Sequence, residues 1–202
     1  MTTFRLIRHG LKVREIGDVP LTEAGLAQAR LAAGALRERK IAAIVSSPLL
    51  RARETAVPLA RETGRSAVVD DRLRERANWG DVPGQTFAEF VAVWERCTRE
   101  PDYIPPSGDS ARQAARRMTS ALTDWASRYP PGVEIVFVTH GGLITDFLSC
   151  AFSEQELENV CPGFAARQSE LIPECSITDI GYDGGCFRLG KFADTGHLRQ
   201  DG

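Results

Sequence analysis

The 202-residue sequence lacks the features that mark secreted, membrane-spanning and metal-binding proteins. Its five cysteines include no Cys-x-x-Cys pair, which argues against a disulfide framework or a zinc ribbon. No apolar run approaches about 18 residues, and charged residues interrupt the first strand-like run, so we expect neither a signal peptide nor a membrane span. The three histidines have no clustered carboxylates around them. We therefore expect a soluble, cytoplasmic protein with reduced thiols and without a metal or other cofactor.

A strong excess of either charge is also missing. The formal net charge is -2 and both signs are scattered along the chain, so there is no electrostatic footprint for nucleic acid or an anionic membrane. A small molecule or a protein is the favoured partner. With 43% hydrophobic residues, the chain is long enough for one well-filled core and short for two. We predict a single domain over residues 1–202, and the oligomeric state remains open.

Short apolar strands that alternate with amphipathic helices predict an α/β fold. A hairpin is expected near the end of the chain, around Tyr182-Asp183-Gly184-Gly185. The alternation favours a three-layer sandwich in which helices flank a mostly parallel central sheet, with functional sites at the carboxyl ends of its strands. The expected strands are Phe4–Ile7, Ile41–Val45, Glu134–Thr139, Cys175–Ile180 and Phe187–Phe192, and the expected helices are Thr22–Arg39, Pro48–Glu62 capped by Ser47, Thr86–Arg96, Ser110–Arg128 and Leu143–Phe152.

Two of the expected strands end in a histidine that is followed by glycine. These are His9 before Gly10 and His140 before Gly141. A parallel sheet brings the carboxyl ends of its strands to one edge, so we expect both rings at the same edge. Glycine permits a tight turn and lets a ligand approach backbone N–H groups, which suits an anion. The two histidines together therefore indicate a functional site.

Two arginines strengthen the indication of an anion site. Arg8 directly precedes the first histidine, and Arg51 lies in the first turn of a helix that follows another strand end. Two guanidinium groups and a helix amino terminus are suited to a phosphate dianion. A neutral imidazole such as His9 is a competent nucleophile near neutral pH, and a nearby carboxylic acid can protonate the leaving oxygen. Glu75 is our candidate for that acid.

At these residues the sequence resembles the histidine phosphatase superfamily, also called the phosphoglycerate mutase-like family. The resemblance covers nearly the whole chain, and its motifs occur in the family's order. The matching segments are Arg8-His9-Gly10, Pro20 to Ala29, Ser47 to Ala56, Gly108-Asp109-Ser110 with Arg117, Thr139-His140-Gly141-Gly142, and Cys175-Ser176-Ile177-Thr178. The resemblance implies a phosphoglycerate mutase-like fold and a small phosphorylated substrate.

The resemblance also implies roles for individual residues. His9 would carry the phosphoryl group, Arg8, Arg51 and His140 would hold it, and Glu75 would donate the proton. This chain departs from the family pattern after the signature Arg8-His9-Gly10. There, Leu11, Lys12 and Glu15 replace polar or acidic residues that are usual in the family. The family's usual glycine after the acid is displaced to Gly80, which leaves Asp81 as a rival proton donor.

Three functions remain open at this point. The first choice is a metal-independent phosphatase that works through a phosphohistidine on His9. A phosphoglycerate mutase would share His9, but mutases of the family carry Asn where this chain has Gly142. A binding or regulatory module with a decayed site is motivated by Leu11 and Glu15. A serine esterase triad of Ser110, His140 and Asp146 is disfavoured because no nucleophile elbow surrounds the serine, whose expected role is a helix cap.

Substrate specificity is expected to come from three segments near the predicted edge of the sheet. No general rule converts their residues into a ligand. The segments are Val13 to Val19, Trp79 to Phe90, and Pro101 to Ser107.

Overall fold

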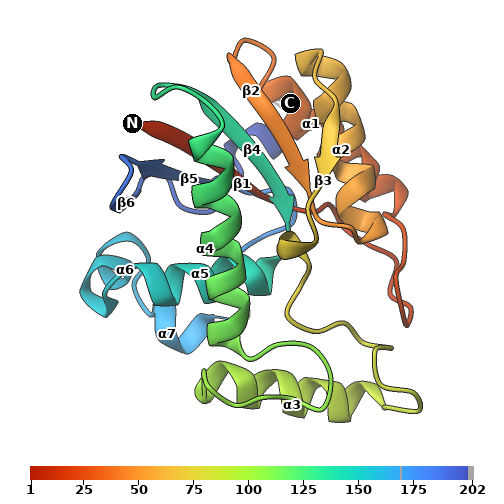
Figure 1. Ribbon diagram of the computed structural model, residues 1–202. Helices are drawn as coiled ribbons and strands as arrows, with labels where there is room; N and C mark the ends of the chain where they lie inside the picture. The colour runs from red at the N-terminus through yellow and green to blue at the C-terminus, as the bar shows by residue number, and fades with distance from the viewer. Residues whose placement is uncertain (169, 200–202) are drawn as a thin grey trace.

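A six-stranded sheet runs through the centre of the computed structural model, which describes residues 1–168 and 170–199 (Figure 1). The strand order is β3-β2-β4-β1-β5-β6. The first four of these strands in that order are mutually parallel, whereas β5 is antiparallel to β1 and to β6. The predicted mostly parallel sheet is confirmed. The strands are β1 (Thr2–Arg8), β2 (Ile41–Ser46), β3 (Ala67–Val69), β4 (Glu134–Thr139), β5 (Ile177–Tyr182) and β6 (Phe187–Leu189).

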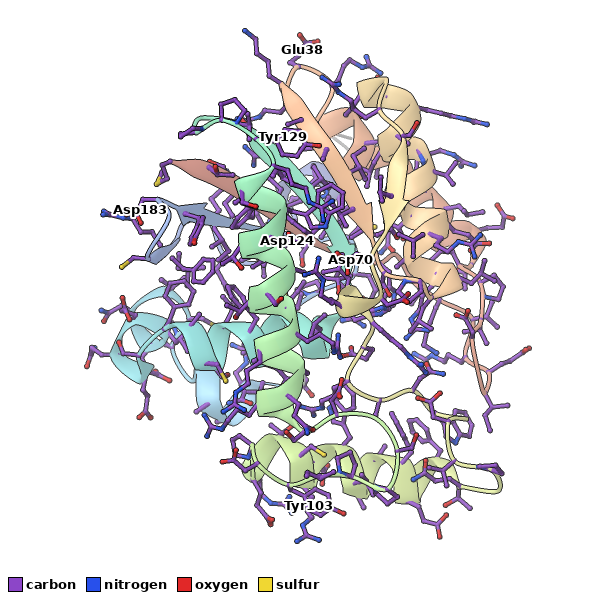
Figure 2. All side chains as sticks on the ribbon, in the orientation of Figure 1. Glu38, Asp70, Tyr103, Asp124, Tyr129 and Asp183 are labelled. Carbon is purple, nitrogen blue, oxygen red and sulfur yellow. The ribbon has the colours of Figure 1, made fainter. Side chains whose placement is uncertain are left out.

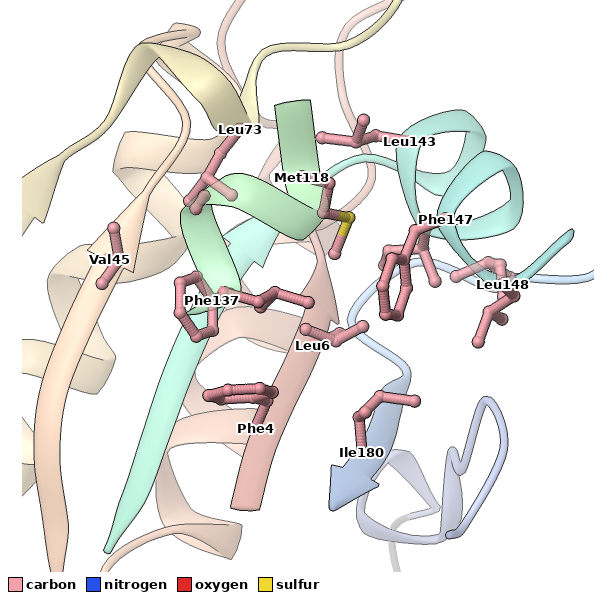
Figure 3. Close-up of a cluster of buried hydrophobic side chains, with 14 of the residues drawn as sticks. Phe4, Leu6, Val45, Leu73, Met118, Phe137, Leu143, Phe147, Leu148 and Ile180 are labelled. Atoms are coloured by element: carbon pink, nitrogen blue, oxygen red, sulfur yellow. The ribbon is translucent and has the colours of Figure 1, made fainter. Parts of the chain in front are cut away.

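Helices cover both faces of the sheet because its strands carry apolar side chains on both faces. Ile7 of β1 packs with α1 (Glu23–Ala35) and α2 (Leu50–Thr63) on one face. Leu6, its neighbour in the chain, packs with α4 (Ala111–Ser127) and α5 (Gly141–Ala151) on the other face. Figure 3 shows this second cluster, in which Leu6 lies with Phe4, Phe137 and Phe147 between the sheet and α5. The predicted three-layer arrangement is confirmed.

Helix α3 (Phe87–Arg99) lies outside these layers, beyond the carboxyl ends of β2 and β4 (Figure 1). Only Cys97 of this helix is buried. The chain that follows folds back beside it, where the guanidinium carbon of Arg96 lies 3.8 Å from the centre of the Tyr103 ring; Tyr103 is labelled in Figure 2. The remaining helical segments are short: α6 (Glu154–Val160), α7 (Phe164–Arg167) and the 3-10 turns Asp71–Leu73 and Gly196–Leu198.

The start of α2 differs from the prediction. The helix begins at Leu50, and Ser47 is not its cap. The reason is that the Ser47 hydroxyl is buried and lies 2.7 Å from Nε2 of His140. The Leu50 N–H donates instead to Oδ1 of Asp18, at 2.8 Å. A carboxylate from a distant loop thus satisfies one of the free N–H groups at this helix terminus.

Other boundaries also shift. Strand β3 was not predicted, because its three residues are exposed and form only the edge of the sheet. Helix α1 ends at Ala35 and β6 at Leu189, earlier than expected, and α5 begins earlier, at Gly141.

No helix within the described part of the chain combines the length and the apolar character needed to cross a membrane.

Candidate active site

The register of three neighbouring strands brings the predicted histidines together. Arg8 pairs with Thr139 across β1 and β4, and the His9 N–H donates to the Thr139 carbonyl at 2.9 Å. His9 and His140 therefore leave adjacent parallel strands at the same edge of the sheet, with ring centres 5.2 Å apart. Ser47, at the end of β2, completes this row through its hydroxyl contact with His140.

The hydrogen bonds of His9 determine which ring nitrogen can react. Nδ1 lies 2.8 Å from the Gly10 carbonyl oxygen. Because a carbonyl only accepts, this contact places the proton on Nδ1 and leaves the lone pair on Nε2. Nε of Arg51 donates to this Nε2 at 3.2 Å. Burial, and secondly the Arg51 charge, lower the pKa of His9 well below its usual value, so the ring stays neutral at neutral pH.

Arg51 projects into the site from the first turn of α2. Nη2 of Arg51 donates to Oδ1 of Asn78 at 3.3 Å, and Asp18 lies 3.9 Å from Nη1. Nη1 is buried and has no hydrogen-bond partner among the described residues. Burial lowers the pKa of Arg51, although Glu75 and Asp18 oppose the shift. An incompletely paired buried guanidinium next to a neutral imidazole is suited to bind an anion.

Arg8 approaches from the other side, where it lies against the first turn of α5. Its Nη2 donates to Glu174 at 2.7 Å and its Nη1 to the Ile172 carbonyl. Nε of Arg8 is buried without a partner in the described part of the chain, as is Nδ1 of His140. A Cβ atom on Gly141 would lie 3.3 Å from Cδ of Arg8, so glycine permits this close approach.

Gly10 lies behind the predicted site, where it packs against α1. Its N–H donates to the Thr55 hydroxyl at 3.0 Å and is therefore already engaged. A Cβ atom at this position would lie 2.6 Å from the Gly25 carbonyl oxygen. Glycine is therefore needed where the loop after β1 packs closely on α1. Gly10 does not line the cavity described below.

Glu75 lies at the amino terminus of α5. Its Oε2 accepts the Gly142 N–H at 3.1 Å, and its Oε1 accepts the Arg76 N–H at 3.0 Å. Both oxygens of the rival Asp81 accept from Arg74 at 3.0 Å. Glu75 lines the cavity at the strand ends, whereas Asp81 does not. Of the two candidate acids, only Glu75 is therefore placed at the site.

A cavity of about 400 Å³ opens in front of His9. Arg8, Arg51, Glu75 and Gly141 line it together with His9, whereas His140 is buried beside it. The structure thus gathers most of the predicted site residues in one place.

Leu11, Lys12 and Glu15, which replace the family's usual polar or acidic residues, lie near the same cavity. Lys12 and Glu15 both line it, whereas Leu11 does not. Burial, and next the charges of Arg51 and Arg8, lower the pKa of Lys12. Lys12 therefore adds a third cationic group to the positively charged end of the cavity, where it can offset Glu15.

The far wall of the cavity contains residues that the sequence analysis missed. Of the three expected specificity segments, Pro101 to Ser107 contributes none of the lining residues, whereas α3 contributes a row along one face. The lining residues of α3 recur every three or four residues, at positions 87, 90, 91, 94 and 98, which is the spacing of one helical face. This spacing could have identified the lining face of α3 from the sequence. From α3 and α5, the additional lining residues are Val91, Trp94, Thr98, Thr145 and Asp146.

Comparison with known proteins agrees with this geometry. The family model of the histidine phosphatase superfamily, branch 1, matches residues 4–195. The chain belongs to the histidine phosphatase superfamily, as the resemblance of its motifs predicted.

Individual relatives include both phosphatases and mutase-like proteins. The chain is 32% identical to phosphoglycerate mutase-like protein 4 of Arabidopsis thaliana, over 98% of this chain and 87% of the relative. It is 34% identical to glucosyl-3-phosphoglycerate phosphatase of Mycobacterium tuberculosis, over 69% of this chain and 70% of the relative. A solved structure of a mycobacterial glucosyl-3-phosphoglycerate phosphatase with VO3 superposes with a TM-score of 0.76 at 29% identity, covering 96% of this chain and 99% of that one.

The buried, neutral His140 predicts a specific dependence of stability on pH. Burial lowers the pKa of His140 well below its usual value, and Arg51 contributes to the shift. As the pH falls below about 6.5, the unfolded chain therefore binds a proton that the folded protein does not. The contribution of His140 to stability is complete above this pH and is lost below it, by up to about 1.4 kcal/mol per pH unit. His9 acts in the same direction, and Asp146, whose pKa burial raises to about 7, acts in the opposite one.

We expect His140→Gln to lower the slope of the unfolding free energy against pH by the equivalent of about one proton. The slope is measured by urea unfolding at several pH values between 7.5 and 5. His197→Gln is the control, because the pKa of that half-buried ring is lowered less. Equal slopes for the wild type and His140→Gln would show that His140 is not buried neutral.

Proposed function

We propose that this protein is a metal-independent phosphatase that hydrolyses a phosphomonoester through a phosphohistidine on His9. The observation that carries the proposal is the position of His9 Nε2, which holds a lone pair and lies 3.2 Å from Arg51 Nε. Around it lie buried nitrogens of Arg8, Arg51 and His140 that have no partner in the described part of the chain. These groups can hold a phosphate dianion at the nucleophile.

The proposed reaction has two displacement steps. In the first, the Nε2 lone pair of His9 forms a bond to phosphorus while the bond from phosphorus to the ester oxygen breaks, and Glu75 gives its proton to that oxygen. In the second, the Glu75 carboxylate takes a proton from water. The water oxygen then bonds to phosphorus, the bond from phosphorus to nitrogen breaks, and His9 is restored.

Positive charge around the phosphoryl group supports both steps. Arg8, Arg51 and Lys12 line the cavity, and Gly141 places the amino terminus of the 11-residue helix α5 there. Preorganised charges of this kind stabilise the negative charge on the equatorial oxygens without a reorganisation cost. Because His9 is neutral, no proton occupies its Nε2 lone pair, which can attack once the Arg51 N–H turns from Nε2 to the phosphoryl oxygens.

A mutase is the second candidate, because several matched relatives are named as phosphoglycerate mutases or as mutase-like. Mutases of the family carry Asn at the position of Gly142. Here a Cβ atom at position 142 would lie 2.6 Å from Trp94 Cζ2 and 2.8 Å from Glu75 Oε1. The arrangement around Glu75 therefore requires glycine, which favours hydrolysis over transfer back to substrate.

Phosphate release from an aryl phosphate without added metal supports the phosphatase, and dependence on a bisphosphoglycerate primer supports the mutase.

A binding module with a decayed site would show neither activity. Leu11 and Glu15 motivated this third possibility. The intact geometry of His9 and Arg51 argues against it.

The first prediction of this mechanism is a phosphorylated His9. Rapid quenching at neutral or alkaline pH should trap an acid-labile, base-stable phosphoryl group on this ring, because phosphoramidates have that stability profile. Mass spectrometry of the digested protein locates the group. His9→Ala should show no adduct and no turnover, whereas His197→Ala, outside the cavity, should retain both. A fully active His9→Ala enzyme would refute the assignment.

Arg51 should stabilise the transition state of the reaction more than it stabilises the folded protein. Arg51→Ala is expected to lower kcat by roughly 10²- to 10³-fold, by analogy with the loss of one oxyanion donor. Arg53→Ala is the matched control, since Arg53 is exposed two residues further along the same helix. Steady-state kinetics should show near wild-type kcat for Arg53→Ala, and equal effects of the two substitutions would contradict the role of Arg51.

The choice between Glu75 and Asp81 can be tested by varying the leaving group. A general acid matters most when the departing oxygen is a poor leaving group. Glu75→Gln should therefore slow hydrolysis of an alkyl phosphate by roughly 10²- to 10⁴-fold, and that of 4-nitrophenyl phosphate much less. Asp81→Asn, which removes a carboxylate already paired with Arg74, should show no such dependence. The reverse pattern would assign the acid to Asp81.

A further inference from the structure

The Ser47 hydroxyl is a buried polar group to which the proposed reaction assigns no step. It lies 2.7 Å from Nε2 of His140, and both side chains have an exposure of 0%. The N–H of Leu49 donates to the same oxygen at 3.3 Å. Ser47 does not line the cavity. Any contribution of this hydroxyl to the site therefore passes through the ring of His140.

The two neighbours of the Ser47 hydroxyl determine where its own proton points. A backbone N–H only donates, so Leu49 uses a lone pair of the oxygen and cannot accept the hydroxyl proton. Among the described residues, the one acceptor within hydrogen-bond distance is Nε2 of His140. If Nε2 carried a proton, the hydroxyl proton would be buried without an acceptor, which is rare in native proteins. The geometry therefore favours donation from the hydroxyl to Nε2.

This direction of the hydrogen bond fixes the tautomer of His140. Burial lowers the pKa of the ring well below its usual value, so the ring is neutral at neutral pH and carries a single N–H. With Nε2 occupied as an acceptor, that proton lies on Nδ1. Nδ1 is buried and has no partner in the described part of the chain, and its ring centre is 5.2 Å from that of His9.

The position of the proton decides how His140 interacts with an anion beside His9. With the proton on Nδ1, the unpaired nitrogen is a donor and can bind a phosphoryl oxygen. With the proton on Nε2, the same nitrogen would present a lone pair to a dianion and would repel it. Only the tautomer that Ser47 favours is therefore suited to the proposed ligand.

We infer that Ser47 is a positioning residue, whose hydroxyl holds His140 in the tautomer that donates from Nδ1 to the bound phosphoryl group. This inference rests on the proposed function, because it assigns the support of one proposed phosphate-binding group. It also gives a reason for the unusual start of α2. The serine faces His140, and Asp18 accepts the free N–H of Leu50 in its place.

The other two histidines provide reference signals for both tautomers. The chain has three histidines in all. Nδ1 of His9 lies 2.8 Å from the Gly10 carbonyl, and Nε2 of His197 lies 3.0 Å from the Cys175 carbonyl. Because carbonyls only accept, His9 carries its proton on Nδ1 and His197 carries its proton on Nε2.

The tautomer of His140 can be measured in the wild-type protein by NMR. With ¹⁵N-labelled histidine at pH 7.5, correlations from the ring C–H protons distinguish a protonated nitrogen from an unprotonated one. His9→Ala and His197→Ala each remove one set of signals, which assigns the remaining set to His140. We expect a protonated Nδ1, as in His9. A protonated Nε2 would overturn the inference without any substitution of Ser47.

Ser47→Ala should lower the fraction of His140 that carries its proton on Nδ1, because a neutral imidazole in water prefers the other tautomer. The Kd of a ligand rises by the inverse of the fraction of protein that is competent to bind it. The Kd of inorganic phosphate, measured by calorimetry, should therefore rise by roughly 3- to 10-fold. Its rise should match the fraction measured by NMR, and kcat/KM should fall to a similar extent.

Ser46→Ala is the matched control. Ser46 is the preceding residue and is 1% exposed, but its hydroxyl donates to the Ser47 carbonyl at 3.0 Å. This variant should keep the tautomer, the phosphate Kd and the kcat/KM of the wild type.

A double variant tests whether Ser47 acts through His140. In a His140→Ala background, Ser47→Ala should cause no further loss of kcat/KM, whereas an independent structural role would give additive losses. If the wild type hydrolyses no phosphomonoester, 4-nitrophenyl phosphate included, the proposed function fails, and the tautomer and the phosphate Kd still decide the inference. An unchanged tautomer in Ser47→Ala, or additive losses in the double variant, would overturn it.

Discussion

The site depends on the parallel pairing of β1 with β4. The hydrogen bond from the His9 N–H to the Thr139 carbonyl extends that pairing by one residue beyond the strand. It brings two histidines that are far apart in the chain to ring centres 5.2 Å apart. A shift of the register by one residue would turn one ring to the other face of the sheet. The sheet core, with Leu6 and Phe137 on one side and Ile7 on the other, fixes this register because both faces are buried.

Burial of the two histidines has an electrostatic consequence that suits the proposed chemistry. Both rings are buried, and Arg51 lies beside them, so both pKa values fall and both rings are neutral at neutral pH. Neutral rings do not repel the guanidinium groups, which allows Arg8, Arg51 and Lys12 to gather at one end of the cavity. Carboxylates offset part of this charge, because Glu174 pairs with Arg8 and Asp18 lies 3.9 Å from Arg51. A bound phosphate dianion would offset more of it, which links the stability of the site to its proposed ligand.

The sequence predicted the residues at the sheet edge more completely than the opposite wall. The expected specificity segment Trp79 to Phe90 contains three aromatic residues of that wall, but it ends before Trp94. His9, His140 and Arg51 follow strand ends, and parallel topology alone determines where strand ends meet. Helix α3 lies outside the sheet, so no strand register places its aromatic face over the cavity. Ser47 was expected to cap α2 because its type and position fit that role. Its hydroxyl bonds to His140 instead, a contact between two strands that local sequence does not reveal.

Trp94 connects the two halves of the cavity. Its ring lies so close to Gly142 that no side chain fits there, and Gly142 donates its N–H to Glu75. Arg76, the residue after Glu75, stacks on the same ring and pairs with Asp146. The proposed acid and the Arg76–Asp146 ion pair therefore share one support, and that support belongs to α3, in which only Cys97 is buried. A movement of α3 would displace Trp94 and change both ends of the site together, so we expect binding of the leaving group and placement of the acid to be coupled.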